Sequence, residues 1–108
     1  MALIRKKVTS VKWPVSISSP ADGGTWKDES YTGTFKKVGI KQIEELADKG
    51  DPQLIREVLE AWEDIKDEDG NEIPFSLVEL DLFLDDVNFI KGTVQAIIEM
   101  QKGASEKN

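Results

Sequence analysis

Residues 59–80 read LEAWEDIKDEDGNEIPFSLVEL, and this stretch predicts how the helical part of the chain is divided. Its centre, DGN at residues 69–71, is typical of a tight turn, because Gly70 accepts a positive φ and the flanking side chains can bond their own backbone. Pro74 then prevents one helix from running through the segment. We therefore expect one helix to end before this acidic turn and another to begin after it.

The helix after the turn has a well-marked start. Ser76 is followed three residues later by Glu79, the capping-box pattern in which both side chains accept hydrogen bonds from backbone N–H groups at the helix start. Phe75 and Leu80 stand at the positions of a hydrophobic staple. A helix is therefore predicted to begin at or very near Ser76 and to run through Leu77, Leu80, Phe83 and Leu84.

The acidic turn also has to be tested as a calcium-binding loop. With Gly70 at the sixth position of an EF-hand loop, the first ligand position falls on Ile65 and the twelfth on Ser76. Both positions need carboxylates, so the motif fails at both ends. A solvated turn between two helices is the simpler interpretation.

Two helices are predicted before the turn. Residues 40–49 have apolar side chains at helical spacing, with Gly50 as the C′ residue. Asp51 and Pro52 then restart the chain as N-cap and first helical residue. The second helix carries a broad apolar stripe made of Leu54, Ile55, Val58, Leu59, Trp62 and Ile65.

A fourth helix, capped by Asp85 and Asp86, is predicted to run towards Gly103. Gly92 in its middle lowers its local stability by roughly 1 kcal/mol relative to Ala. Its apolar residues exceed a single stripe, which suits a central helix or one that also meets a partner. The partner-binding candidates are apolar side chains along this helix, namely Phe89, Val94, Ile97 and Met100.

The N-terminal part, residues 11–37, has the pattern of a β-hairpin. Residues 11–17 alternate apolar and polar side chains, as a half-buried strand does, and Pro14 favours an edge position. The cluster SSPADGG at residues 18–24 is typical of a hairpin turn. An isolated hairpin is marginal in water, so it should pack on the helices or on a neighbouring subunit. Residues 26–36 are predicted to form the return strand, with Tyr31, Gly33 and Phe35 on one face.

The predicted fold class is α+β, an N-terminal β-hairpin followed by about four short α-helices packed as a small bundle. A length of 108 residues is typical of a single domain, here 1–108, with 39% hydrophobic residues to form a modest core. Within it we expect the helical part at 40–102 and flexible ends at 1–10 and 103–108. The chain has no Cys, no apolar run of about 20 residues and no signal-peptide pattern, which favours a soluble protein away from membranes.

The net charge of −7 is unevenly distributed. Residues 1–41 hold eight basic and three acidic residues, a net of +5, whereas residues 42–108 hold six basic and eighteen acidic residues, a net of −12. The acidic total disfavours nucleic acid as a partner. Such asymmetry can align like molecules head to tail into a ring or spiral, although both surfaces can also simply be solvated. The expected homo-oligomer interface pairs two sets of residues, Lys27, Lys36 and Lys37 with Asp64, Asp67 and Glu68.

We find no catalytic motif. The chain has neither His nor Cys, so the common nucleophile and base arrangements cannot be built, and no glycine-rich loop fits a phosphate-binding fingerprint. We therefore expect no enzymatic activity, cofactor or metal site. Two groups of carboxylates remain as acid/base or magnesium candidates, but a solvated turn and helix-capping charges explain them more simply: Asp67, Glu68, Asp69 and Glu72, and then Asp81, Asp85 and Asp86.

Several motifs together resemble one protein family. They are WPV at residues 13–15, PADGG at 20–24, YTGTFKK at 31–37, and Trp62 followed by KDEDGNEIPFS at 66–76. In their order and spacing, over nearly the whole chain, they resemble the tail assembly chaperones of long-tailed bacteriophages. The motifs are structural and not catalytic, so the resemblance assigns no site residues.

The resemblance implies a non-catalytic assembly factor in the cytoplasm of the host bacterium. Proteins of this family bind and solubilise the long, apolar, helical tape measure protein, help recruit tail tube subunits, and are absent from the mature virion. It also implies a longer form, made by a programmed frameshift, that engages the tail tube protein, and the codons of Glu106, Lys107 and Asn108 could supply the slippery site. The alternatives are a structural virion protein of the tail or connector and an acidic protein that mimics DNA.

Overall fold

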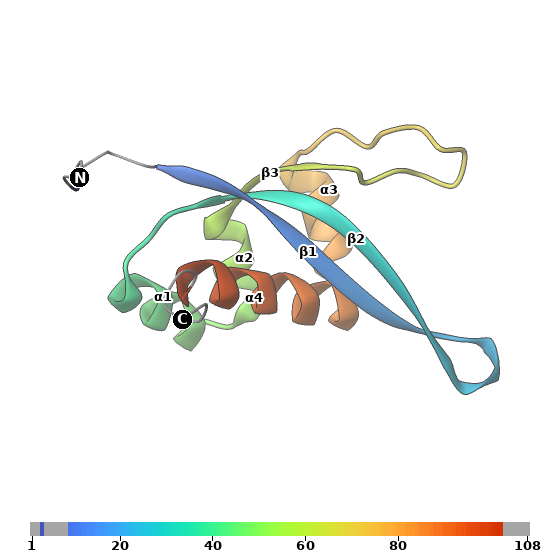
Figure 1. The fold of residues 1–108 in the computed structure, drawn as a ribbon, viewed down its shortest axis with the longest axis horizontal. Coiled ribbons are helices and arrows are strands. Elements are labelled where there is room, and N and C mark those ends of the chain that lie inside the picture. Colours follow the sequence, from blue (N-terminus) through green and yellow to red (C-terminus); the bar gives the residue numbers. More distant parts are fainter. Residues whose placement is uncertain (1–2, 4–8, 103–108) are drawn as a thin grey trace.

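The computed structural model describes residue 3 and residues 9–102. Two long strands are followed by two helices, a short third strand and two further helices (Figure 1). The predicted α+β class and the N-terminal hairpin are confirmed, whereas the third strand was not foreseen. In chain order the elements are β1 (Ser10–Ala21), η1 (Asp22–Gly24), β2 (Thr25–Lys36), α1 (Ile40–Asp48), α2 (Asp51–Val58), β3 (Leu59–Glu63), α3 (Leu77–Phe83) and α4 (Val87–Lys102).

Strands β1 and β2 pair antiparallel along their full length, from Ser10 opposite Lys36 to Ala21 opposite Thr25. Gly23 and Gly24 turn the chain with φ values of 80° and 76°, which side chains other than Gly disfavour. The alternation predicted from the sequence sets which side chains face the helices, because the side chains of a strand point alternately to its two faces. The inward set includes the buried side chains Val15, Tyr31 and Phe35.

The third strand, β3, corrects the prediction of one continuous second helix. The helix α2 ends at Val58, and the next five residues pair antiparallel with β2, which gives the sheet order β1-β2-β3. Ala61 lies opposite Thr34, and Leu59 lies opposite Phe35, so Glu60 is an extra residue in a β-bulge. The bulge lets Leu59 and Trp62 both face the core, although their separation of three residues is the spacing of a helix.

The helices cover one face of this sheet, as expected for a hairpin that packs on the helices. Helix α4 packs mainly against β1 and also contacts α2, and α1 packs on α2 (Figure 1). Sheet and helices therefore share one core. Its buried apolar side chains come from every strand and every α-helix, namely Val15, Tyr31, Phe35, Leu46, Leu54, Ile55, Val58, Leu59, Trp62, Leu80, Phe89, Ala96 and Ile97.

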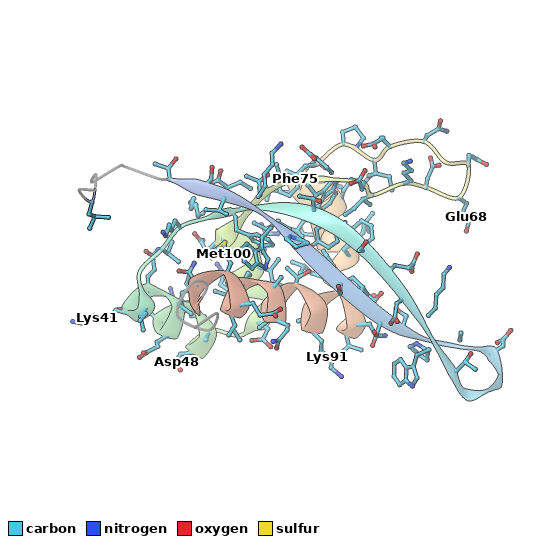
Figure 2. The ribbon with its side chains drawn as sticks, in the orientation of Figure 1. Lys41, Asp48, Glu68, Phe75, Lys91 and Met100 are labelled. Carbon is cyan, nitrogen blue, oxygen red and sulfur yellow. The ribbon has the colours of Figure 1, made fainter. Side chains whose placement is uncertain are left out.

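The predicted acidic turn is confirmed as the tip of a short loop between β3 and α3. Asp64, with a φ of 67°, ends β3 and turns the chain away from the sheet. The backbone N–H of Ile73 donates to the carbonyl of Ile65 over 2.8 Å, and Gly70 occupies the tip with a φ of 84°. Figure 2 shows Glu68 at the far end of this loop, well away from the sheet.

Of the three N-caps predicted from the sequence, two agree with the structure. The Ser76 hydroxyl accepts a hydrogen bond from the backbone N–H of Glu79 over 3.1 Å, as the capping pattern predicts. The Asp86 carboxylate accepts from the backbone N–H of Asn88 over 2.8 Å at the start of α4. For α2, however, Gly50 is the N-cap and Asp51 is the first helical residue, so that boundary was predicted one residue late.

The chain ends were predicted to be flexible at 1–10 and 103–108. Most of these residues lie outside the described part of the chain, as do those of the predicted frameshift site. Ser10, however, begins β1, and the carbonyl of Thr9 accepts a hydrogen bond of 3.0 Å from the backbone N–H of Lys37. The sheet therefore reaches slightly further towards the N-terminus than the sequence predicts.

Candidate functional site

The partner-binding residues predicted on the fourth helix do not form an exposed surface. Phe89 is 3% exposed and Ile97 is 0% exposed, because α4 lies between the sheet and α2. Val94 and Met100 are partly buried against the same core. The expectation that this helix presents its apolar side chains to a partner is therefore wrong for Phe89 and Ile97.

An exposed apolar surface does exist on the neighbouring helix α3. Leu77, Val78, Leu82 and Val87 are each between 52% and 73% exposed, and we call these four residues the α3 face. On its other side, the same helix buries Leu80 completely in the core. Because α3 is apolar on both sides, one side holds it on the protein and the other meets solvent.

The charged residues within the segment that carries the α3 face are all acidic. No basic residue occurs between Ser76 and Asn88 in the sequence. Of the acidic side chains in that range, Asp81 forms an ion pair with Arg56 of α2, which ties α3 to the rest of the molecule. The surface thus combines apolar side chains with negative charge from Glu79, Asp81, Asp85 and Asp86.

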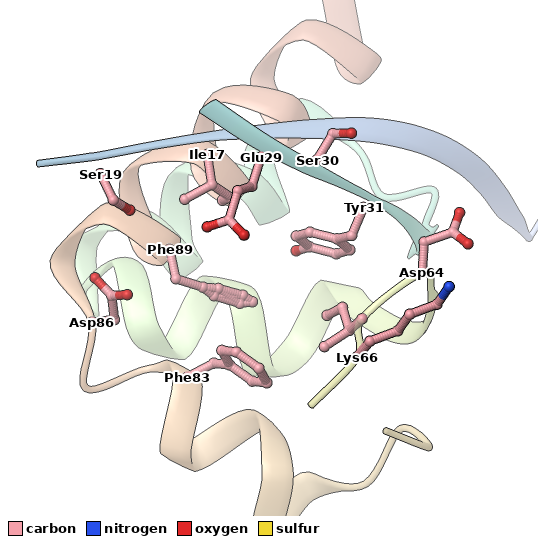
Figure 3. Close-up of a pocket in the computed structure, with 11 residues that line it drawn as sticks. Ile17, Ser19, Glu29, Ser30, Tyr31, Asp64, Lys66, Phe83, Asp86 and Phe89 are labelled. Atoms are coloured by element: carbon pink, nitrogen blue, oxygen red, sulfur yellow. The ribbon is translucent and has the colours of Figure 1, made fainter. Parts of the chain in front are cut away.

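A groove of about 190 Å³ opens next to the α3 face. We call it the aromatic groove, because Tyr31, Phe83 and Phe89 form part of its wall (Figure 3). The ring centroids of Phe83 and Phe89 are 5.0 Å apart, and those of Tyr31 and Phe89 are 5.6 Å apart. These tilted and edge-on contacts are the favoured arrangement for aromatic pairs, so the wall is well packed.

The charged side chains of the aromatic groove are Glu29, Asp64, Asp86 and Lys66. In Figure 3 Glu29 points from β2 towards Phe89, while Asp64 and Lys66 lie at the end near Tyr31. Three carboxylates against one ammonium group give the groove a net negative charge. The groove therefore favours cations or positively charged side chains over anions.

Deep in the wall, the hydroxyl groups of Tyr31 and Thr93 share a hydrogen bond of 2.7 Å. Burial raises the pKa of the Tyr31 hydroxyl well above its ordinary value, and the bond to Thr93 offsets only part of this rise. Tyr31 is therefore neutral over the whole physiological pH range. It joins β2 to α4 and gives the groove no charge.

The basic residues of the predicted oligomer interface do not lie together. Lys36 pairs with Ser10 at one end of the hairpin, and Lys27 pairs with Ser19 towards the other. Nine residues of extended chain separate the two lysines by roughly 30 Å. Lys37 follows directly after Lys36, so only Lys27 lies on the distal part of the hairpin.

The acidic residues of that interface are brought together on the loop after β3. Asp64 stands at its base and Glu68 at its tip, both exposed. The Asp67 carboxylate accepts hydrogen bonds from the backbone N–H groups of Asp69 and Asn71, over 2.9 and 3.0 Å. Asp67 therefore shapes the turn, whereas Asp64 and Glu68 are exposed and form no ion pair within residues 9–102.

Sequence reasoning missed the α3 face, although the signal was present. Residues 77–83 read LVELDLF, five apolar residues in seven, which is more than one buried stripe of a short helix requires. The pattern also predicts a surplus of apolar residues on α4, but there the sheet covers it. Which of two apolar helices is covered depends on the position of the sheet, and the sequence did not reveal the third strand.

No helix among residues 9–102 is long and apolar enough to cross a membrane. Within the same part of the chain, no group of three or more carboxylates is placed to hold a metal ion.

Fold and surface together define a small α+β protein with an exposed apolar helix face bordered by acidic residues. The chain was compared with models of protein families, with curated proteins and with solved structures, and nothing matched in any of the three.

Proposed function

We propose that this protein is a tail assembly chaperone of a long-tailed bacteriophage, which binds the tape measure protein and keeps it soluble during assembly. The observation that carries the proposal is the α3 face, four exposed apolar side chains gathered at α3 and the start of α4. Exposed apolar clusters with a polar border are typical of surfaces that bind another protein. The tape measure protein is proposed as the partner because the sequence motifs resemble those of this family.

The chemistry of the α3 face fits an amphipathic helix as the partner. Val78 and Leu82 are four residues apart, so they lie on the same side of α3 and can pack against apolar side chains of a second helix. The acidic border favours partners that carry Lys or Arg beside their apolar stripe. The net charge of −7 keeps such a carrier soluble while its apolar surface is free.

The remaining parts of the proposal follow from the same role. The protein acts without catalysis in the cytoplasm of the host bacterium and is absent from the mature virion. A longer, frameshifted form recruits tail tube subunits. Copies associate head to tail as a ring or spiral, in which Lys27 on the hairpin meets Glu68 at the tip of the acidic loop of the next copy.

Co-expression with the tape measure protein tests the proposal. In the double variant Val78→Gln/Leu82→Gln, Gln keeps the helix propensity high while it removes the apolar contacts. Each such side chain contributes about 1.5–3 kcal/mol when it is fully buried by a partner. We expect the wild-type chaperone to hold the tape measure protein in the soluble fraction. With the double variant, most of the tape measure protein should precipitate.

Ile40→Gln is the matched control, because Ile40 is 74% exposed but lies at the start of α1, outside the α3 face. This variant should solubilise the tape measure protein as well as the wild type does. The proposal fails if the tape measure protein precipitates equally with and without the wild-type chaperone. It also fails if Ile40→Gln and the double variant behave alike.

A further inference from the structure

The aromatic groove, which the proposed function does not use, has a lining suited to one kind of side chain. We infer that it holds a Lys or Arg side chain of the apolar segment that binds to the α3 face. The inference rests on the proposed function and specifies its partner further. It names a basic residue beside the apolar stripe as a second requirement for binding.

The size of the groove argues for a single side chain as its occupant. Its volume of about 190 Å³ is well below the roughly 300–1,000 Å³ of sites for cofactors and drug-sized ligands. A folded segment or a nucleotide does not fit such a space. One long, narrow side chain that enters from the open end does.

The wall chemistry selects a basic side chain. The rings of Phe83 and Phe89 offer apolar surface to the methylene stem of Lys or Arg, and they attract its cationic end through the negative face of the ring. Glu29, Asp64 and Asp86 then supply carboxylates for the charged end, against Lys66 as the one basic residue in the lining. An acidic side chain would be repelled, and a purely apolar one would leave these carboxylates with less contact to water.

These carboxylates are only weakly engaged within the described part of the protein. No ion pair there involves Asp64 or Asp86, and Glu29 lies 3.9 Å from Lys27, close to the limit for such a pair. Asp86 also caps α4 with one carboxylate oxygen. Glu29 and Asp64 are therefore the groups most available to an incoming cation.

The groove and the α3 face have neighbouring residues in the chain. Leu82 of the face directly precedes Phe83 of the groove, and Asp86 of the groove directly precedes Val87 of the face. Residues of both therefore lie in the corner between α3 and α4. A single segment can place apolar side chains on α3 and a neighbouring basic side chain in the groove.

Three synthetic amphipathic helical peptides test this inference. They share a leucine stripe and differ at one position beside it, which holds Lys, Arg or the uncharged norleucine. Affinities for the wild-type protein are measured by fluorescence anisotropy at low and high salt. We expect the Lys and Arg peptides to bind roughly five- to tenfold more tightly at low salt, an advantage that high salt reduces.

The double variant Glu29→Gln/Asp64→Asn should remove this advantage and leave the norleucine peptide unaffected. Asn suits position 64, because it tolerates the positive φ of Asp64. Glu44→Gln/Glu45→Gln on α1 is the control, with the same change of net charge far from the groove. The control should keep the preference for basic peptides, and circular dichroism should show both variants folded.

Equal binding of all three peptides to the wild type overturns the inference but leaves the proposed function intact. A loss of preference in the α1 control overturns it as well, because the effect would then come from overall charge. If the groove variant changes the sedimentation of the protein alone while peptide binding stays the same, the groove receives a second copy and the inference is wrong. If none of the peptides binds, the proposed function fails with it.

Discussion

A Cβ atom on Gly92 of α4 would lie 2.4 Å from the backbone carbonyl oxygen of Ser16 in β1. It would also lie 2.6 Å from the Cδ1 atom of Ile17. Both distances are far shorter than any normal van der Waals contact, so α4 can lie this close to β1 only with Gly at position 92. This single residue therefore determines how closely the central helix packs on the sheet.

Gly92→Ala should consequently destabilise the protein, although Ala is favoured over Gly in an isolated helix by about 1 kcal/mol. We expect the free energy of unfolding to fall by about 1–3 kcal/mol, because α4 must move away from β1. Chemical denaturation measures the change. Gln95→Ala, at an exposed position of the same helix, is the control and should shift stability by less than about 0.5 kcal/mol. A Gly92→Ala protein as stable as the wild type would contradict this packing.

Trp62 should be the most costly side chain to remove. It is buried, its ring meets Phe75 and Phe83 edge-on, and its indole N–H donates to the carbonyl of Ile73 over 2.7 Å. Trp62→Ala should lower the free energy of unfolding by about 3–5 kcal/mol in a denaturation experiment. Trp26→Ala is the control, because Trp26 is 65% exposed, and it should cost little. Equal effects of the two substitutions would disprove the assignment of Trp62 to the core.

Tyr31 should titrate far above an ordinary tyrosine. It is the single tyrosine of the chain, so tyrosinate absorbance follows this residue alone. Burial raises the pKa in the folded state, so above pH of about 10 the folded protein binds more protons than the unfolded one, and stability falls as the pH rises. The folded protein should therefore titrate later than protein unfolded in guanidinium.

Tyr31→Phe provides the complementary measurement. At neutral pH it should cost about 1–2 kcal/mol, because the buried hydroxyl of Thr93 loses its partner. At alkaline pH it should lose stability less steeply than the wild type, since one group that titrates on unfolding is gone. A common pH dependence for both proteins would show that Tyr31 is not protected from ionisation.

Ser76→Ala should weaken the start of α3. The Ser76 hydroxyl satisfies the backbone N–H of Glu79, and its loss should cost about 1 kcal/mol. Because α3 carries the α3 face, this variant should also bind the leucine-stripe peptides less tightly. Ser76→Thr, which keeps a capping hydroxyl, should restore most of both properties. A failure of Thr to rescue would point to a role other than capping.

Local features of the fold were determined by the sequence. The turn at Gly70, the caps at Ser76 and Asp86, and the alternation that buries Val15 and Tyr31 all depend on residues close together in the chain. Each follows from backbone sterics or from a hydrogen bond within a few residues. These features could be predicted without knowledge of the remaining chain.

Two features were decided by the tertiary structure alone. Leu59 and Trp62 lie in a strand and not in a helix, and α3, not α4, keeps an exposed apolar side. The spacing of Leu59 and Trp62 fits a helix, but β2 offers a free edge, and the bulge at Glu60 turns both side chains into the core. Once the sheet covers α4, Phe89 and Ile97 are buried, and the apolar surplus of α3, with Val78 and Leu82, stays in solvent. The physical reason is that the hydrophobic effect is non-directional and depends only on the apolar area removed from water. The position of the covering layer therefore determines which apolar surface is left exposed.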